Sequence, residues 1–506
     1  MNLEHYVKKI LNSQVYEAAI ETPLQYAKNI SNRLQHEVWI KREDLQPVFS
    51  FKIRGAYNRM SKLSPAERER GVICASAGNH AQGVAYAAHQ LKIRAVIVMP
   101  KTTPDIKVQA VRAHGGHSVK VVLHGDAFDE AAEYSQKLMQ EQHLTYIHPY
   151  DDPETIAGQG TIAREILHQY SQPIDAIFIC VGGGGLIAGM AAYIKYLRPE
   201  IKVIGVEFEE SACLAAAMKA GRRVKLAQVG IFADGAAVAQ VGKVAWSICR
   251  ETVDEVITVT AQEICAAVKD IFDDTRSIAE PAGALAMAGM KKYALARTQK
   301  NETYMVTCSG ANMNFDRLAF VAEQAEVGEQ REALLAVTIP ERPGAFKAFC
   351  AVVGKRPVTE FNYRYDDAQA ANIFVGIRVQ DGKEKLALIG ELMAADYRVE
   401  DLSENDVATT HIRHMVGGKS QHAEDELLYR FEFPERPGAL MNFLRTLGGR
   451  WNISLFHYRN HGDAYGRVLC GFQVPKADRE NFQQRLIEVG YQCWDETQNP
   501  AYQMFL

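Results

Sequence analysis

The stretch AIFICVGGGGLIAGMAAYIKYL, residues 176–197, decides the fold of this chain. A short apolar run ends at Val181, four consecutive glycines follow, and a helical pattern covers Leu186–Leu197. A buried strand that turns through glycines into a helix is the repeating unit of an α/β protein. Residues 176–194 carry no charge over 19 positions, as a membrane span would, but the four central glycines argue against a membrane helix.

The same alternation continues on both sides of this stretch, from about Val38 to Ser309. Short apolar, β-branched runs alternate with amphipathic helices such as 79–91 and 104–114. The nearly continuous apolarity of the runs is typical of parallel strands covered on both faces. We therefore predict a doubly wound α/β domain with a cleft between two lobes. The predicted strands are 38–41, 71–75, 95–99, 119–123, 176–181, 203–208, 256–260 and 304–308.

The sequence changes character after Arg317. Residues 322–331 (AEQAEVGEQR) are polar without apolar periodicity, and we interpret them as a linker. Beyond them TIPERPGAF (338–346) is echoed 94 residues later by EFPERPGAL (432–440). Each copy predicts a βαββαβ unit large enough to be a domain. The predicted domains are 1–325, 332–415 and 426–506, with 416–425 as a connector.

Composition narrows the class of protein. With 506 residues, 47% of them hydrophobic and 23% charged, the chain has material for about three globular domains. A net charge of −4 leaves no basic surplus for nucleic acid or an anionic membrane, so neither is expected as a partner. No basic segment with an apolar core opens the chain, so we expect no secretory leader. Nine cysteines without CxxC spacing indicate reduced thiols and a cytoplasmic protein.

Two features of the α/β domain indicate a phosphate site and an amine. The bare amides of Gly182–Gly185 and the helix behind them can bind a phosphate, although a glycine run also serves in a packed turn. No GxxxxGK[ST] pattern is present, which disfavours a nucleotide loop. Lys52, in SFKIRGA (50–56), follows a predicted strand and turn, where α/β proteins deliver side chains to a cleft. Together they suggest pyridoxal phosphate (PLP) held on Lys52 as a Schiff base; the alternative is a solvated lysine.

Three further motifs follow predicted strands or begin helices. In SAGNH (76–80), Ser76 and Asn79 can cap the next helix, and the same amides can bind a carboxylate. His80 has no partner visible in the sequence, which favours a structural role. Ser309 is either a turn residue or a hydroxyl partner for a pyridine nitrogen. In AEPAGA (279–284) the proline explains a helix start, and Glu280 needs no function there.

The order of these motifs is more specific than any one of them. SFKIRGA, SAGNHAQG, VGGGGLIAG, AEPAGA and SGAN follow one another between residues 50 and 312. This order resembles the fold-type II PLP enzymes and, within them, the threonine deaminases. The two C-terminal copies resemble the paired ACT-like regulatory domains of the biosynthetic, isoleucine-controlled members. The resemblance covers nearly the whole chain and implies a two-lobed α/β catalytic domain followed by two ferredoxin-like (ACT-like) domains.

The resemblance also assigns roles to matching residues. It implies that Lys52 forms the Schiff base and, once freed, removes the Cα proton, for which its pKa must fall well below about 10.4. A neutral Ser309 hydroxyl would leave the pyridine nitrogen largely unprotonated, which suits β-elimination. Ser76, Ala77, Gly78 and Asn79 would hold the substrate carboxylate. The cofactor contacts it implies are Phe51, Lys52, Asn79, Gly182, Gly183, Gly184, Gly185, Leu186 and Ser309.

The implied reaction is β-elimination of L-threonine, and less well of L-serine, to a 2-oxoacid and ammonia. Serine racemases are similar too, but they carry an acid–base serine at the position of Ala77, where alanine cannot carry a proton. They can also bind a divalent cation near the segment matching Glu207–Cys213; Cys213 stands where an acidic ligand is expected, so we predict no metal. The alternatives are threonine synthase or a β-replacement enzyme of the same fold, and a non-catalytic amino-acid sensor.

For the two C-terminal copies, the resemblance implies an amino-acid sensor. Isoleucine, the end product of the pathway, would inhibit, and valine would oppose it. Phe346 and Leu440 occupy equivalent places in the first turn after Pro-Gly, where an apolar side chain and free amides could receive a branched-chain amino acid. The alternative is a pair of structural or oligomerisation domains. The family suggests a homotetramer.

Overall fold

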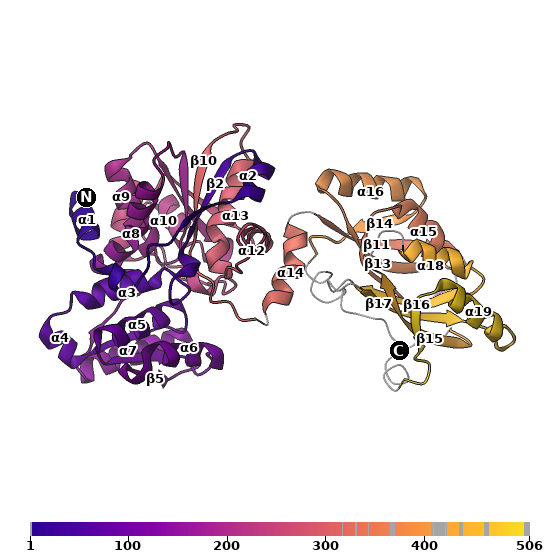
Figure 1. Cartoon of the computed structure of the whole chain (residues 1–506), viewed down its shortest axis with the longest axis horizontal. Helices are drawn as coiled ribbons and strands as arrows, with labels where there is room; N and C mark the ends of the chain where they lie inside the picture. Colours follow the sequence, from indigo (N-terminus) through magenta and orange to yellow (C-terminus); the bar gives the residue numbers. More distant parts are fainter. Residues whose placement is uncertain are drawn as a thin grey trace. The chain divides into compact units, whose positions relative to one another are not determined.

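The computed structural model shows two compact units, Met1–Ala325 and Glu326–Leu506 (Figure 1). The structure describes residues 3–315, 317–328, 331–342, 344–364, 370–405, 408, 420, 423–434, 439–459 and 465–499. The first unit holds the α/β elements, and the second holds the tandem repeat. The predicted connector, 416–425, lies largely outside the described residues.

A six-stranded sheet forms the large lobe of the first unit. Its order is β1-β2-β10-β7-β8-β9, and only the short edge strand β1 is antiparallel to its neighbour. Strands β7 and β10 are buried along their whole length, which explains their unbroken apolar sequences. The strands are β1 (Leu24–Tyr26), β2 (Glu37–Arg42), β7 (Ala176–Cys180), β8 (Lys202–Phe208), β9 (Glu255–Val259) and β10 (Thr303–Cys308).

A separate parallel sheet of order β5-β4-β3-β6 forms the small lobe. The sequence pattern predicted three of these strands within a residue of their observed bounds, but it did not predict the two-residue strand β6. The strands are β3 (Val72–Ala75), β4 (Ala95–Met99), β5 (Val119–Leu123) and β6 (Thr145–Tyr146). The helices between and beside them are α4 (Pro65–Arg70), α5 (Asn79–Leu91), α6 (Asp105–Gly115) and α7 (Phe128–Glu141).

Helix α3 (Lys52–Ser61) joins the two lobes, because it packs against both α5 and α8. The approach to α8 is close: a Cβ on Gly158 would lie 2.6 Å from the Arg54 carbonyl oxygen. Lys52 is thus the first residue of the helix at the lobe junction. The large-lobe helices are α1 (Leu3–Leu11), α2 (Lys28–Leu34), α8 (Pro153–Gln169), α9 (Gly185–Leu197), α10 (Cys213–Ala220), α11 (Lys243–Thr252), α12 (Ala261–Thr275) and α13 (Pro281–Leu295).

Helix α14 (Arg317–Gly328) shows that the linker interpretation of residues 322–331 was wrong for most of that segment. Val321 and Ala325 lie one helical turn apart and are buried in the large-lobe core, at 4% and 1% exposure. These two apolar residues make no recognisable helical period in the sequence around 322–331. Their burial against an existing core is nevertheless enough to stabilise the helix. The boundary between the two units falls near the end of this helix.

The second unit is built on one eight-stranded sheet of order β14-β11-β13-β12-β16-β17-β15-β18. Each repeat has the predicted βαββαβ order, and strands β12 and β16 pair antiparallel at the centre, with Phe361 opposite Tyr458. This pairing removes two exposed sheet edges and gives the repeats a single core. The first repeat comprises β11 (Glu332–Pro340), α15 (Ala345–Val353), β12 (Val358–Arg364), β13 (Ala370–Arg378), α16 (Gly382–Ala394) and β14 (Arg398–Asp401); the second comprises β15 (Glu426–Pro434), α18 (Ala439–Leu447), β16 (Asn452–Arg459), β17 (Tyr465–Gln473), α19 (Arg479–Val489) and β18 (Gln492–Asp495).

The uncharged stretch 176–194 is divided among strand β7, the glycine loop and helix α9. Across the described residues, no helix has the length and apolarity that crossing a membrane requires.

Candidate active site

One cavity of the first unit collects the predicted cofactor contacts from both lobes. Ser76, Ala77 and Gly78, predicted to hold the substrate carboxylate, are half-buried and do not line this cavity. The lining residues are Phe51, Lys52, Asn79, Pro149, Tyr150, Cys180, Gly182, Gly183, Gly184, Gly185, Leu186, Gly235, Ala236, Val238, Glu280, Ala282 and Ser309.

Lys52 is anchored by its neighbours along the chain. Ser50 forms a β-bridge to Gly310, and the Phe51 amide donates to the Ser309 carbonyl at 3.2 Å. The Lys52 amine donates to the Pro149 carbonyl oxygen at 3.3 Å. Burial lowers the pKa of Lys52 to about 8, an effect that the nearby Cys180 and Glu280 oppose. About a tenth of this amine is therefore uncharged at pH 7 and about half at pH 8, and the uncharged form is the one that acts as nucleophile or base.

The glycine loop needs glycine for space. A Cβ on Gly183 would lie 2.2 Å from the Tyr150 ring, and one on Gly182 would lie 2.9 Å from the Ala236 Cα. Gly184 has a φ of +90°, which side chains rarely adopt. Helix α9 begins at Gly185, so its first amides and its positive dipole end face the same loop. The loop is therefore a cradle for a phosphate.

Asn79, the first residue of α5, connects the small lobe to the large lobe. Its side-chain amide donates to Glu280 Oε1 at 2.5 Å, and its Oδ1 accepts from Asn312 Nδ2 at 2.7 Å. The preceding turn is held by the Ser76 hydroxyl oxygen, which accepts from the amides of Gly78 and Ala81 at 3.3 Å each. Ser76 thus accepts hydrogen bonds from amides at the start of α5, as the sequence predicted. The Asn79 side chain makes no capping bond and lines the cavity instead.

Among the cavity side chains that the sequence did not predict are an acid, Glu280, and a phenol, Tyr150. Glu280 is buried, and burial, together with the charge of Asp234, raises the pKa of its carboxyl to about 7. It makes no capping bond to α13, although it precedes Pro281. Tyr150 lies against the glycine loop. Both residues reach the cavity through long-range packing, and the local pattern around Glu280 is fully explained by a helix start.

The remaining predicted residues are placed as follows. Ser309, 2% exposed after β10, donates its hydroxyl to the Ala282 carbonyl at 3.3 Å. His80 is buried, and burial, with the charge of Lys52, lowers its pKa to about 3, so it is neutral at physiological pH. The Glu207 carboxylate accepts from the first amides of α10, and the Cys213 thiol donates to the Gly182 carbonyl at 3.4 Å. Among the described residues, no cluster of three or more His, Cys, Asp or Glu side chains could hold a metal ion.

These features fit PLP as the bound group. The cradle is bare where a phosphate needs backbone amides, and a Cβ at Gly183 would close it. Lys52 supplies an amine of lowered pKa, and Ser309 supplies a neutral hydroxyl on the same cavity. Residues Gly182–Leu186 would hold the phosphate, and Asn79 and Ser309 would contact the ring.

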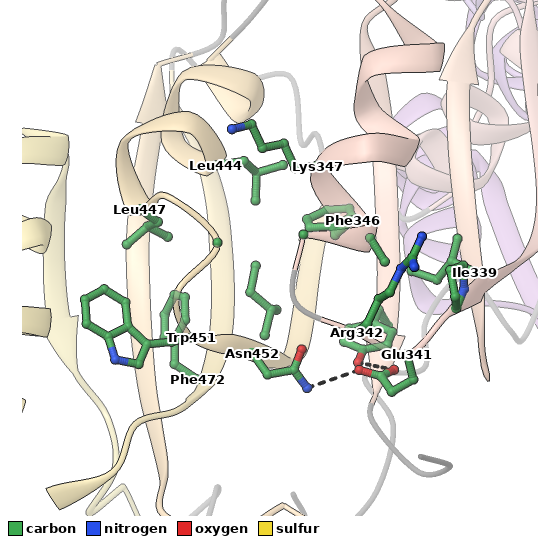
Figure 2. A pocket seen from close by; sticks show the side chains of 16 residues that line it. Ile339, Glu341, Arg342, Phe346, Lys347, Leu444, Leu447, Trp451, Asn452 and Phe472 are labelled. Atoms are coloured by element: carbon green, nitrogen blue, oxygen red, sulfur yellow. Dashed lines mark hydrogen bonds between the residues drawn. The ribbon is translucent and has the colours of Figure 1, made fainter. Parts of the chain in front are cut away.

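A second cavity lies in the C-terminal unit, between the two repeats (Figure 2). Phe346, which we expected from the sequence to contact an effector, lines it, and its ring centre lies 4.4 Å from that of Phe361. Leu440 does not line it; this side chain is half-buried against the core of the unit. The second repeat contributes instead side chains after and at the end of helix α18, among them Leu444, Leu447, Trp451 and Asn452.

Polar groups gather at one end of this second cavity. The Glu341 carboxylate accepts from Asn452 Nδ2 at 3.1 Å and from the Tyr363 hydroxyl at 2.7 Å. Figure 2 shows the first of these bonds and places Arg342 beside Glu341. An acid, a guanidinium and an apolar wall are the groups that recognise a free amino acid with an apolar side chain.

Taken together, the fold and the first cavity define a fold-type II PLP-dependent enzyme with an appended regulatory unit. Residues 15–310 match the family of pyridoxal-phosphate dependent enzymes, and residues 323–412 and 417–506 match the C-terminal regulatory domain of threonine dehydratase. The chain belongs to the biosynthetic threonine dehydratases and is a PLP-dependent lyase.

Individual relatives agree with this assignment along the whole sequence. L-threonine dehydratase biosynthetic IlvA from Burkholderia multivorans is 55% identical over 501 residues, 99% of either chain. The enzyme of the same name from Escherichia coli is 53% identical over 503 residues, covering 99% of this chain and 97% of its own. The solved structure of processed threonine deaminase isoform 2 from Solanum lycopersicum has a TM-score of 0.62 and 50% identity, over 64% of this chain and 93% of that one.

Proposed function

We propose that this chain converts L-threonine to 2-oxobutanoate and ammonia, uses L-serine less well, and is inhibited by isoleucine bound to its C-terminal unit. The observation that supports the reaction is the Lys52 amine, whose pKa is lowered to about 8 beside the bare glycine cradle. The relatives named above, which match over their full length, are called threonine dehydratases.

Each part of the chemistry has a candidate residue. PLP, when bound, supplies the electron sink for the pair left at Cα. Lys52 is the base that takes the Cα proton, because an uncharged amine can accept it. The amides of Gly182–Leu186 hold the phosphate, and the Ser309 hydroxyl orients the ring without adding charge. Ala77 has no group that can carry a proton to the opposite face of Cα, so elimination is favoured over racemisation.

The start of α5 is the proposed substrate site. The segment Ser76–Asn79 places amides at a helix N-terminus, where the dipole favours a carboxylate. Asn79 lines the same cavity as Lys52, which supports a substrate site that extends from this turn toward the amine. Only a small β-substituent would then need room, which suits threonine and serine.

A 2-oxoacid assay on threonine tests the reaction directly. We expect 2-oxobutanoate from the wild-type chain and none above background from Lys52→Ala. The conservative variant Lys137→Met, which removes an exposed lysine from α7, serves as the control and should keep wild-type activity. Turnover of a phosphorylated amino acid or of a thiol nucleophile, with no 2-oxoacid from threonine, would instead identify threonine synthase or a β-replacement enzyme.

The second cavity is the proposed isoleucine site. Glu341 would receive the α-amino group, Arg342 the carboxylate, and Phe346 with Leu444 and Leu447 the branched side chain. Valine, one methylene shorter, would fill the apolar part less completely and oppose isoleucine by occupying the same place. The observation that supports this site is that both repeats contribute side chains to one cavity. A bound amino acid would therefore contact both repeats and hold them in one arrangement.

Calorimetric titration with isoleucine, beside inhibition of the threonine reaction, tests this site. Phe346→Ala should weaken binding by about tenfold or more, as expected when a large, half-buried aromatic side chain is lost from an apolar contact. Leu440→Ala should have a smaller effect, because Leu440 packs on the core away from the cavity. Unchanged affinity in Phe346→Ala would rule out this cavity as the isoleucine site.

Assembly and location complete the proposal. We infer a homotetramer in the cytoplasm, with a catalytic domain at 1–325 and regulatory domains at 332–415 and 426–506. The described cysteines are all unpaired, and eight of them are buried, which is consistent with a reducing compartment. Sedimentation velocity of the full chain tests the tetramer; a single species of about 56 kDa, the mass of one chain, would contradict it.

A further inference from the structure

Asp234 joins three parts of the first unit at the rim of the cofactor cavity. Lys107, on small-lobe helix α6, donates to Asp234 Oδ2 at 2.6 Å. Arg317, at the start of α14, places its guanidinium 3.9 Å from Asp234 Oδ1. Asp234 itself belongs to the large lobe, in a short 3-10 turn (Asp234–Ala236). Neither ion pair takes part in the chemistry proposed above.

The turn that carries Asp234 is also a wall of the cavity. Gly235 and Ala236 line it, and Asp234 Oδ1 accepts from the Gly235 amide at 3.0 Å. A Cβ on Gly235 would lie 3.0 Å from the Ala282 Cβ, while Ala236 sits against Gly182 of the phosphate cradle. A shift of Asp234 would therefore move backbone that touches both ends of the cofactor site.

Helix α14 holds the same loop from the other side. Arg317 donates to the Phe232 carbonyl oxygen at 2.9 Å and stacks on the Phe232 ring, 5.4 Å from its centre. Phe320, one turn along, has its ring centre 5.9 Å from that of Phe232. The last residues of α14 reach the boundary between the two units, so this helix contacts the loop and is continuous along the chain with the regulatory repeats.

We propose that Asp234 is a positioning residue. Its ion pair with Lys107, here called the lobe latch, holds the small lobe closed over the cavity. Helix α14 sets the position of this latch through Arg317 and Phe320. The side chains of Lys107 and Asp234 are 20% and 37% exposed. Such a partly exposed pair is weak and screened by salt, which suits a contact that opens to admit substrate. The regulatory half of this inference rests on the proposed isoleucine inhibition.

Steady-state kinetics without effector tests the latch. Asp234→Asn keeps an oxygen for the Gly235 amide but removes the charge, and Lys107→Met removes the partner. Each should lower kcat/KM for threonine about two- to fivefold, mainly through KM, and the double variant should be no worse than either single one. The wild-type kcat/KM should fall with added salt, and Asp234→Asn should lose that dependence. Cofactor absorbance should stay at the wild-type level, and Lys137→Met should match wild type throughout.

Unchanged kcat/KM, or additive losses in the double variant, would overturn the latch. The second measurement compares isoleucine binding with isoleucine inhibition in the full chain. Arg317→Met and Phe320→Ala should bind isoleucine with near wild-type affinity by calorimetry yet need at least about fivefold more for half-inhibition. Inhibition identical to wild type would overturn the regulatory half. A wild-type chain that does not bind isoleucine would refute the proposed effector, and the kinetic test would still decide the latch.

Discussion

The proposed chemistry of the catalytic unit depends on a lysine amine, that of Lys52, which loses its charge around pH 8. An exposed lysine has a pKa of about 10.4. In the first turn of α3, burial lowers the pKa of Lys52 to about 8, while the neighbouring Cys180 and Glu280 act in the opposite direction. Burial is therefore the dominant effect, and the fraction of uncharged amine rises steeply between pH 7 and 8.

Attachment of PLP to the apoenzyme should report this pKa. Only the uncharged amine attacks the cofactor aldehyde, so the attachment rate should rise with pH with a midpoint near 8. It should level off about one pH unit higher, where nearly all of the amine is uncharged. Stopped-flow absorbance gives the rate, and borohydride trapping confirms the covalent link. Lys52→Ala should trap no cofactor. A rate still rising at pH 10 would mean that the amine is solvated.

Glu280 should tune that midpoint. Its carboxyl has a pKa of about 7, so above pH 7 it is mostly charged and raises the pKa of Lys52. Glu280→Gln keeps an acceptor for the Asn79 amide but removes the charge. The attachment midpoint should therefore move to lower pH, and the variant and wild type should converge below pH 7, where Glu280 is protonated. A shift to higher pH would contradict this arrangement.

Gly183→Ala should strongly weaken cofactor binding while leaving the fold intact. The added Cβ would lie 2.2 Å from the Tyr150 ring, so either the ring or the cradle must move. We expect PLP affinity to fall about a hundredfold, as for a lost set of phosphate contacts worth about 3 kcal/mol. Gly390→Ala in α16 is the matched control, because nothing lies within 4 Å of its Cβ position. Equal PLP affinity in the two variants would exclude Gly183 from the cradle.

The sequence predicted those residues of the candidate site that come soon after a recognisable strand. Lys52, the glycine loop and Ser309 each follow a strand, and strand ends on parallel sheets converge. Glu280 and Tyr150 could not be found in this way. Their neighbours in sequence describe a helix start and a short loop. Only packing between separate segments of the chain brings Glu280 to the cavity of Lys52 and Tyr150 against Gly183.

At the scale of elements, the position of α3 is fixed by a buried charge network behind Lys52. Arg54 is fully buried and pairs with Glu43, at 2.7 Å, and with Glu165 of α8. Lys41 of β2 pairs with the same Glu165 at 2.6 Å, so two positive and two negative charges balance. The helix that carries Lys52 is thereby tied to a strand and a helix of the large lobe.

Arg54→Met should lower the free energy of unfolding by about 3–5 kcal/mol, because it leaves Glu43 and Glu165 buried with one cation fewer. Arg59→Met on the same helix is the control; Arg59 is 19% exposed and pairs with Asp152 at 3.3 Å, so its loss should cost at most about 1 kcal/mol. Denaturant unfolding of both variants measures the difference. Equal losses would show that the network does not hold the helix.

Elements with their own periodicity could be predicted, and elements stabilised by contacts alone could not. Helix α5 was predicted with its observed bounds, since its apolar and small residues repeat along the helix. Helix α14 was mistaken for a linker because Val321 and Ala325, the apolar side chains known to be buried there, make no recognisable period. Strand β6 has two residues, too few for an alternating pattern, and exists because β3 pairs with it.

On the scale of the whole molecule, the tandem repeat predicted two domains but not the way they share a sheet. The pairing of β12 with β16 merges them, and the cavity between the repeats takes different side chains from each copy. The equivalence of Phe346 and Leu440 in sequence therefore does not extend to the cavity. A repeated motif specifies the fold of each copy, whereas the contact between copies depends on residues outside the motif, such as Trp451 and Asn452.

Two shortened chains should separate catalysis from control. A chain ending at Ala325 keeps Val321 and Ala325 in the core and keeps the contacts of Arg317 and Phe320 with Phe232. It should turn over threonine at a rate near that of the full chain and should no longer respond to isoleucine. A chain ending at Asn314 lacks α14, so part of the apolar core becomes exposed and the loop that carries Asp234 loses its contacts with the helix. This chain should unfold at a lower temperature, and its kcat/KM should fall about two- to fivefold or more. Threonine assays with and without isoleucine, beside thermal melts, give both results. Inhibition of the Ala325 chain by isoleucine would place the effector site in the catalytic unit, and equal kcat/KM in the two shortened chains would show that α14 does not position the loop.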